Sequence, residues 1–419
     1  MDKISNIFKG DKVIWMVFFF LCVISIVEVF SASSTLSYKT SNYFGPIAYH
    51  VFMILIGFFI GIVTLNIPCR YFKLVTPVLL LISFFTLLWV LFGGESINGA
   101  NRVIRLPGFT FQPSEIAKGT LVLATAQILS AMQKEDGSGA HPNAMKFVMF
   151  LTVPIVLLIA IENLSTACLL FSVIIMMLFI GRVPMLQFGK LIGVLTLCVG
   201  IGLGLIIGIG TIENNKMEQQ RAEAAKTGDK TVLKGGGVFH RFATWRNRIL
   251  KHGGGTDVAP ENYDINENFQ RGHANIAIAR SGISGVGPGN SMEREFLPQA
   301  FSDFIYAIII EEMGIIGAFA VVILYIFLLF RVGHIASQCE NNFPAFLVLG
   351  LSLLLVVQAC INMMVAVGIM PITGQPLPLI SKGGTSTIIN CAYIGAILSV
   401  SRSAKKVDGK ATPALETSN

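Results

Sequence analysis

Charged residues are scarce in this sequence. Only 13% of its 419 residues are Asp, Glu, Lys or Arg, whereas 53% are hydrophobic, and the mean hydropathy is +0.69. Soluble domains carry about 25% charged residues, so this composition excludes an ordinary soluble protein. Apolar runs of about 20 residues, the length that crosses a bilayer core, recur along the chain. We therefore predict an all-α polytopic membrane protein.

Common catalytic and metal-binding motifs are also lacking. The seven cysteines lie in or beside the apolar runs, and no CxxC or CxxC…H spacing occurs. This pattern implies neither a disulfide framework nor a zinc site. The sequence contains no P-loop, HExxH or GxSxG motif and no nucleic-acid-binding motif. We expect no nucleic-acid partner.

The apolar runs predict ten membrane-spanning helices. The first run is long and is not followed by a small-residue cleavage site, so we interpret it as a retained helix. The predicted spans are 13–33, 46–65, 73–92, 114–133, 145–161, 164–182, 187–210, 303–331, 343–368 and 384–401. Together they form one transmembrane domain over 1–401, with a large loop at 211–302 and a polar tail at 402–419.

Charge predicts the orientation of these spans. Lysines and arginines concentrate at the N-terminus, in alternate short loops and in the tail. The positive-inside rule therefore places both termini in the cytoplasm and the loop 211–302 on the extracytoplasmic side.

The large loop is basic but mixed in pattern. At 213–234 acidic residues interleave with lysines, which favours a solvated charged segment over an anion-binding one. At 241–251 cations alternate with Phe242, Trp245 and Ile249, which is typical of an interfacial amphipathic helix. Arg246 in this segment is a candidate phosphate contact, and a purely interfacial role is equally compatible with the pattern.

Three polar clusters adjoin the predicted outer side. In the first, 97–119, Pro113 fits the start of a helix. Glu115 and Lys118 are three residues apart, so they share a helix face and can neutralise each other. Such a pair is compatible with a site and equally with a purely architectural ion pair.

The second cluster, 370–386, contains three prolines and three glycines between two spans. Irregular backbone at membrane depth is tolerated where it lines a cavity or is buried in protein. We interpret this segment as a cavity-lining loop to which Ser381 and Lys382 contribute polar groups. An ordinary tight loop is the alternative.

The third cluster is 290–314. Pro298 cannot lie inside a helix, so the eighth span should begin after it. Ser302 would then be the N-cap and Asp303 a first-turn acid, a role that is as compatible with the residue type as catalysis. Glu311 and Glu312 lie deeper and require cationic or hydrogen-bonding partners, for which Lys118 is the expected intramembrane candidate.

Together the clusters resemble the SEDS family (shape, elongation, division, sporulation) of integral-membrane peptidoglycan glycosyltransferases. The family pattern around its aspartate is matched by Leu297, Pro298, Asp303, Phe304, Ile305, Ala307, Glu311, Glu312 and Gly314. The NGARRWI…FQPSE-x-AK pattern is matched by Asn98, Gly99, Ala100, Arg102, Ile104, Phe111, Gln112, Pro113, Ser114, Glu115, Ala117 and Lys118. The proline-glycine pattern is matched by Pro371, Thr373, Gly374, Pro376, Leu377, Pro378, Ile380, Ser381, Gly383, Gly384, Thr385 and Ser386.

The resemblance covers nearly the whole chain and is stronger to the FtsW branch than to the RodA branch. Ser31, Ala32 and Ser33 and the glycine-rich segment 285–291 point to that branch. The sequence departs from the family at Gln299 and Phe301, where the family has glutamate and histidine, and at Lys382, where it has tyrosine.

The resemblance implies an activity and a set of roles. It implies polymerisation of lipid II into glycan strands during cell division, with a lipid diphosphate as leaving group and Asp303 as the catalytic residue. General-base chemistry suits that carboxylate, and the resemblance suggests Glu115 and Lys118 as cavity residues. Because the leaving group is anionic, we add Arg102, Lys382 and Arg246, with Ser381 from the loop, so that the substrate-binding candidates are Arg102, Glu115, Lys118, Ser381, Lys382 and Arg246. Structural or cavity candidates are Pro298, Glu311, Glu312, Pro376, Gly383 and Gly384. A divalent cation, most simply Mg²⁺, would offset the leaving-group charge, although no ligand motif identifies its site.

The expected partners are lipid II, a class B penicillin-binding protein that acts as transpeptidase, and other division proteins. The expected location is the bacterial inner membrane, with the site on the extracytoplasmic face. Two rival hypotheses remain open, a lipid II flippase or other transporter and a catalytically silent division scaffold.

Overall fold

The computed structural model describes residues 8–33, 45–93, 95–97, 100–106, 109–135, 138–227, 246 and 269–408. The chain forms two compact units. The first comprises 1–183, 270–368 and 373–419, and the second comprises 184–269 and 369–372. The predicted single domain over 1–401 stays a prediction.

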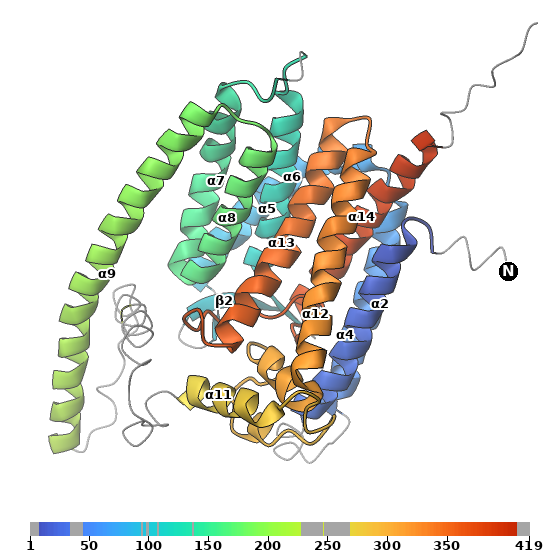
Figure 1. Ribbon diagram of the computed structural model, residues 1–419. Coiled ribbons are helices and arrows are strands. Elements are labelled where there is room, and N and C mark those ends of the chain that lie inside the picture. Colours follow the sequence, from blue (N-terminus) through green and yellow to red (C-terminus); the bar gives the residue numbers. More distant parts are fainter. Residues whose placement is uncertain are drawn as a thin grey trace, which may run out of the picture. The chain divides into compact units, whose positions relative to one another are not determined.

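Each of the ten segments predicted to span a membrane contains a helix (Figure 1). These helices are α2 (Lys12–Ala32), α4 (Gly45–Asn66), α5 (Cys69–Gly93), α6 (Pro113–Ala131), α7 (Asn143–Glu162), α8 (Leu164–Ile180), α9 (Met185–Thr227), α12 (Ile305–Ser337), α13 (Asn342–Ala366) and α14 (Thr385–Asp408). In the described part of the chain, 7 helices are long and apolar enough to cross a membrane, namely α2, α4, α5, α7, α9, α12 and α13. The chain is a polytopic helical membrane protein, and the count of ten spans stays a prediction.

A small β-sheet departs from the predicted all-helical fold. Strands β1 (Glu95–Ile97), β2 (Ala100–Leu106) and β3 (Phe109–Phe111) form an antiparallel sheet in the order β1-β2-β3. The segment was predicted only as a polar loop before α6. β1 and β3 have only three residues each, and the seven residues of β2, ANRVIRL, do not alternate strictly between apolar and polar, so the pattern does not reveal these strands.

The predicted loop 211–302 contains more helix than expected. Helix α9 continues to Thr227, and α11 (Phe269–Ser281) and the short 3₁₀ helix η3 (Glu293–Glu295) follow. Apart from Arg246, the predicted amphipathic segment 241–251 lies outside the described residues. Helix α14 likewise runs past residue 401, where the tail was predicted to begin.

Helix α12 begins later than predicted. Its N-cap is Phe304, which makes no side-chain capping bond, so the prediction of Ser302 as N-cap and Asp303 in the first turn is wrong. Asp303 instead lies in the turn that precedes the helix. The helix is also broken at Gly314, which has φ 68 and ψ −169.

The helices of the first unit pack in pairs that bring distant segments together. Helix α12 packs against α2 and α13, α14 packs against α4, and α6 packs against α5 and α13 (Figure 1). Asp11, the N-cap of α2, accepts hydrogen bonds from Val13 N and Ile14 N (2.9 and 3.3 Å). It also accepts one from Arg331 NH2 on α12 (2.7 Å), and its backbone N–H donates to Ser401 Oγ on α14 (3.0 Å). At this end of the bundle the buried Asp11 carboxylate therefore joins α2 to α12, and the Asp11 backbone joins α2 to α14.

Candidate active site

The three polar clusters converge on one cavity in the first unit. Its volume is about 320 Å³. The lining residues are Tyr49, Val103, Thr110, Gln112, Glu115, Asn163, Gln299, Phe301, Ser302, Asp303, Gly374, Gln375, Pro376, Lys382, Gly383, Gly384, Thr385 and Ser386. They come from α4, β2, β3, the N-termini of α6, α8 and α14, the turn before α12 and the loop between α13 and α14. The prediction that 370–386 contributes a cavity-lining loop is confirmed for residues 374–376 and 382–386.

Asp303 is held at the cavity from several sides. Ser302 Oγ donates to Asp303 Oδ1 (3.1 Å), and Asn362 Nδ2 on α13 donates to the Asp303 carbonyl oxygen (2.8 Å). The backbone of Gly374 lies beside the carboxylate, and a Cβ there would be in van der Waals contact with Asp303 Oδ2 at 3.4 Å. Gly374 also has φ +68, which an L side chain rarely adopts. The sequence therefore places glycine where the loop must approach the carboxylate.

Glu115 and Lys118 form the predicted ion pair. Lys118 Nζ lies 2.9 Å from Glu115 Oε1 and donates to Gln358 Oε1 at 2.8 Å. Glu115 lines the cavity, but Lys118 is fully buried behind it and does not. The second carboxylate oxygen, Glu115 Oε2, is buried and has no hydrogen-bond partner among the described residues. The pair thus leaves one buried carboxylate oxygen of a cavity-lining residue without a hydrogen bond from the described residues.

Side chains from neighbouring helices hold the irregular loop between α13 and α14. Gln358 Nε2 donates to Pro376 O (3.0 Å), Tyr325 Oη donates to Pro378 O, and Ser25 Oγ donates to Ile380 O (2.6 Å). Buried backbone carbonyls need such partners when they lie outside regular structure. The loop is consequently a fixed wall of the cavity.

Ser381 and Lys382 have different places in this wall. Ser381 is buried behind the lining, where its hydroxyl donates to Ser302 O (2.6 Å) and accepts from Leu377 N (2.7 Å). Lys382 lines the cavity, with its Nζ 5.2 Å from the centre of the Phe301 ring. Burial lowers the pKa of the Lys382 ammonium below its ordinary value of 10.5. Lys382 therefore reaches the cavity, whereas Ser381 holds the turn that carries Asp303 from behind the lining.

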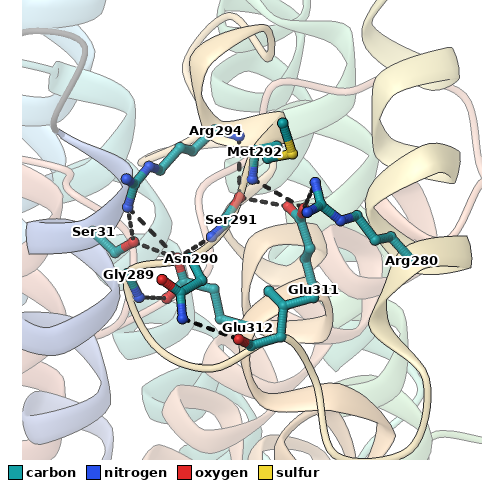
Figure 2. A network of polar contacts seen from close by, with 10 residues as sticks. Ser31, Arg280, Gly289, Asn290, Ser291, Met292, Arg294, Glu311 and Glu312 are labelled. Carbon is teal, nitrogen blue, oxygen red and sulfur yellow. Dashed lines mark hydrogen bonds and ion pairs between the residues drawn. The ribbon is translucent and has the colours of Figure 1, made fainter.

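Glu311 and Glu312 do not line the cavity. Glu311 accepts from Ser291 Oγ and from Met292 N (3.1 Å), whereas Glu312 accepts from Gly289 N (3.0 Å) and from Ser31 Oγ on α2 (Figure 2). Arg280 and Arg294 pair with them, with NH1 to Oε1 distances of 3.8 and 3.9 Å respectively. The expectation that Lys118 would be their partner is wrong, because Lys118 pairs with Glu115.

This network fixes the segment before η3 to α12. At the break in the helix, Val286 N donates to Glu311 O and Gly287 N to Glu312 O, both at 2.9 Å. A Cβ at Gly314 would lie 2.2 Å from Ile283 O, so the close approach requires glycine. Glu311 and Glu312 thus hold α12 to the segment 286–292.

Three further candidates lie in β2, in the second unit and in the turn region before α12. Arg102 lies in β2, but its side chain is outside the described residues. Arg246 belongs to the second unit, where its Nε donates to Thr211 Oγ1 (2.9 Å). Pro298 lies in the turn region before α12 and outside the cavity lining. The substrate contacts predicted for Arg102 and Arg246 stay predictions.

Sequence reasoning missed the buried amides around Asp303. Asn362 Nδ2 also donates to Gln375 O (2.7 Å), and Gln375 Nε2 donates to Thr166 Oγ1 (2.7 Å). The available signal was the pair Gln358 and Asn362, two amides four residues apart in an otherwise apolar span. Polar residues inside spans usually face the protein interior.

Comparison with known proteins points to one family. The family model for FtsW, RodA and SpoVE, described as "Cell cycle protein", matches residues 11–406. The chain is 30% identical over 398 residues to the probable peptidoglycan glycosyltransferase FtsW of Geobacter sp. strain M18, covering 93% of this chain and 96% of that protein. It is 28% identical over 405 residues to the protein of the same name from Escherichia coli O6:H1, covering 95% and 87%.

Solved structures share the fold. A chain from a peptidoglycan synthase complex that coordinates polymerization and crosslinking aligns with a TM-score of 0.68 and 23% identity, covering 94% of this chain and 98% of that one. The rod shape determining protein RodA of Thermus thermophilus aligns with a TM-score of 0.60 and 20% identity, covering 95% and 98%.

Proposed function

Because this chain belongs to the FtsW, RodA and SpoVE family of cell cycle proteins, we propose that it is a peptidoglycan glycosyltransferase that polymerises lipid II during cell division. The names of its relatives support the reaction class. The observation that carries the proposal is the position of Asp303, whose turn lines one cavity together with the other two family-like segments.

In this proposal Asp303 is the general base. The hydroxyl of the acceptor sugar attacks the anomeric carbon of the donor, and Asp303 takes the hydroxyl proton as the new glycosidic bond forms. The bond between the anomeric carbon and the diphosphate breaks, and undecaprenyl diphosphate leaves. A carboxylate suits this task when it lies within hydrogen-bond reach of the reacting hydroxyl.

The leaving diphosphate requires positive charge in the site. Lys382 is the lining cation that we assign to it, and Arg102 is a second candidate on β2. Lys118 acts indirectly, by holding Glu115 at the cavity. Arg246 remains a candidate contact for the lipid diphosphate, outside the unit that contains the cavity.

A divalent cation such as Mg²⁺ fits the lining residues. Mg²⁺ is often held by one or two carboxylates together with substrate phosphates. Glu115 Oε2 is a carboxylate oxygen without a hydrogen-bond partner among the described residues, and Asp303 lines the same cavity. In the described part of the chain no three His, Cys, Asp or Glu side chains lie close enough together to hold a metal ion by themselves, so substrate phosphates would complete the coordination. Such an ion would neutralise charge on the leaving diphosphate.

The proposal includes a location and partners. The charge distribution supports cytoplasmic termini and an extracytoplasmic cavity in a bacterial inner membrane. The fold is shared with a chain of a peptidoglycan synthase complex, which supports partnership with a class B penicillin-binding protein. That transpeptidase would crosslink the strands, and other division proteins would recruit the pair.

The test is reconstitution. The purified full chain, with its class B partner and Mg²⁺, is given labelled lipid II, and glycan strands are resolved by gel electrophoresis. We expect strands to accumulate with time. If no strands form while labelled lipid II crosses the bilayer of liposomes containing the chain, the protein is a transporter and the proposal fails. If neither activity occurs while the partner still binds, the scaffold hypothesis replaces it.

A further inference from the structure

Two buried amides on α13 face the cavity wall. Gln358 and Asn362 lie four residues apart and therefore share a face of the helix. They are 1% and 0% exposed, in a helix apolar enough to cross a membrane. Gln358 reaches Pro376 O and Lys118 Nζ, whereas Asn362 reaches the turn that carries Asp303.

Asn362 joins two walls of the cavity through one group. Its Nδ2 donates to Asp303 O at 2.8 Å and to Gln375 O at 2.7 Å. The first carbonyl belongs to the turn before α12, and the second belongs to the loop between α13 and α14. Because one amide nitrogen makes both bonds, the separation of the two segments is set by a single rigid planar group.

The turn that carries Asp303 depends on such external support. It precedes the first residue of α12, and the N-cap Phe304 makes no side-chain capping bond. Ser381 Oγ holds Ser302 O from the loop, and Asn362 holds Asp303 O from α13. On its other side, Asp303 Oδ2 lies against Gly374. A change at Asn362 would therefore move the carboxylate relative to the wall.

The Asn362 amide is buried although only its nitrogen has hydrogen-bond partners among the described residues. Asn362 Oδ1 is buried and has no hydrogen-bond partner among the described residues. A buried acceptor without a partner costs stability, so stability alone is a poor explanation for an asparagine here. Its two donor bonds are what an apolar residue of similar size could not supply.

We infer that Asn362 is a positioning residue, which fixes the backbone of Asp303 against the segment Gly374–Pro376 so that the carboxylate meets the acceptor hydroxyl. This inference rests on the proposed function. Asn362 does not line the cavity, so it acts through Asp303 and not by contact with the substrate.

The test compares Asn362→Leu with the same substitution at a second buried asparagine. Asn390 on α14 is 2% exposed and lies outside the cavity lining, so Asn390→Leu controls for the loss of a buried amide. The full chain with its class B partner is assayed with labelled lipid II, and binding sites are titrated with the same lipid. Expressing kcat per titrated site corrects for any unfolded fraction.

We expect kcat per site to fall about 100-fold in Asn362→Leu, because small displacements of a reacting group have effects of this size. The Kd for lipid II should change less than about threefold, since ground-state binding is retained. Asn362→Ser, which can donate one hydrogen bond in place of two, should lie between this variant and the wild type. Asn390→Leu should keep the wild-type kcat per site.

Two results would overturn the inference. One is a kcat per site in Asn362→Leu within about threefold of wild type. The other is loss of lipid II binding in both Asn362 variants, which would make Asn362 a residue of general structural importance. If the wild-type chain itself forms no strands, the proposed function fails instead.

Discussion

The buried ion pair between Lys118 and Glu115 allows a sharp prediction about stability. Lys118→Met removes the ammonium that lies 2.9 Å from Glu115 Oε1. Glu115 is only 3% exposed, and its other oxygen already has no hydrogen-bond partner among the described residues. Breaking a buried pair by removing one partner costs about 3–5 kcal/mol.

The double variant Glu115→Leu, Lys118→Met should be more stable than Lys118→Met alone. Replacement of a buried pair by apolar residues of similar size is often neutral. Here one cost remains, because Gln358 Oε1 loses the Lys118 hydrogen bond, and an unsatisfied buried acceptor costs about 1–3 kcal/mol. The double variant should therefore recover part of the loss, although it removes a cavity carboxylate and should be inactive.

Thermal unfolding in detergent, followed by tryptophan fluorescence, measures these effects. At about 2 °C per kcal/mol for a large domain, Lys118→Met should lower Tm by roughly 6–10 °C. The control is Lys146→Met at an exposed position of α7, which should leave Tm unchanged. A Tm for Lys118→Met equal to wild type, or a double variant less stable than Lys118→Met, would refute the reasoning.

Two further predictions concern glycines with positive φ, and a third concerns a pH-dependent contact. Gly314→Ala should prevent correct folding, because its Cβ would meet Ile283 O at 2.2 Å. Gly333→Ala in the same helix is the control, since its Cβ would meet nothing within 4 Å and the variant should fold. Monodispersity on size-exclusion chromatography distinguishes the two variants. Gly374→Ala should lower strand synthesis at least tenfold, about 1.4 kcal/mol or more in the barrier, because it places a methyl group against the catalytic carboxylate on a backbone with positive φ. Gly282→Ala has a similar positive φ with nothing within 4 Å, and it should retain activity in the same assay. Burial raises the pKa of Asp11, but its hydrogen bonds to a guanidinium and to two backbone N–H groups outweigh that effect and lower the pKa below 3.8. The ionised carboxylate therefore stabilises the fold above about pH 4, and the Tm advantage of wild type over Asp11→Asn should be present at pH 7 and fall as the pH drops through the folded-state pKa.

The sequence predicts the helices well because membrane spans have a strong compositional signal. Each predicted span contains a helix, and Pro113 begins α6 as expected for a proline at the first helical position. The pairing of Glu115 with Lys118 is also predictable, since both lie on one helix at a fixed spacing. These features depend on local sequence only.

Features that depend on tertiary contacts are not predictable in this way. Ser302 has the residue type of an N-cap, but Ser381 and Asn362 hold the turn from outside, and the helix begins at Ile305. The break at Gly314 arises because the segment at 283–285 packs against it. The spacing of residues along the sequence indicates neither the contacts at the turn nor the contact at Gly314.

The cation partners of Glu311 and Glu312 illustrate the same limit. Lys118 is a lysine inside a predicted span and is therefore the expected partner. In the structure the two glutamates pair instead with Arg280 and Arg294, which precede α12 in the chain. Both arginines belong to the predicted loop, whose path back to the helix cannot be derived from hydropathy. The role inferred for Asn362 has the same limit, since it depends on the two carbonyls that its amide contacts in the fold.

The most direct test of the central claim is the rate of strand synthesis by Asp303→Asn. This substitution keeps the size of the side chain and removes its ability to accept a proton, so the Kd for lipid II should be nearly unchanged. General-base catalysis contributes about 10²–10⁴-fold, and we predict a loss of strand synthesis in that range. Strand synthesis by Asp303→Asn at the wild-type rate would contradict the assignment of Asp303 as the base.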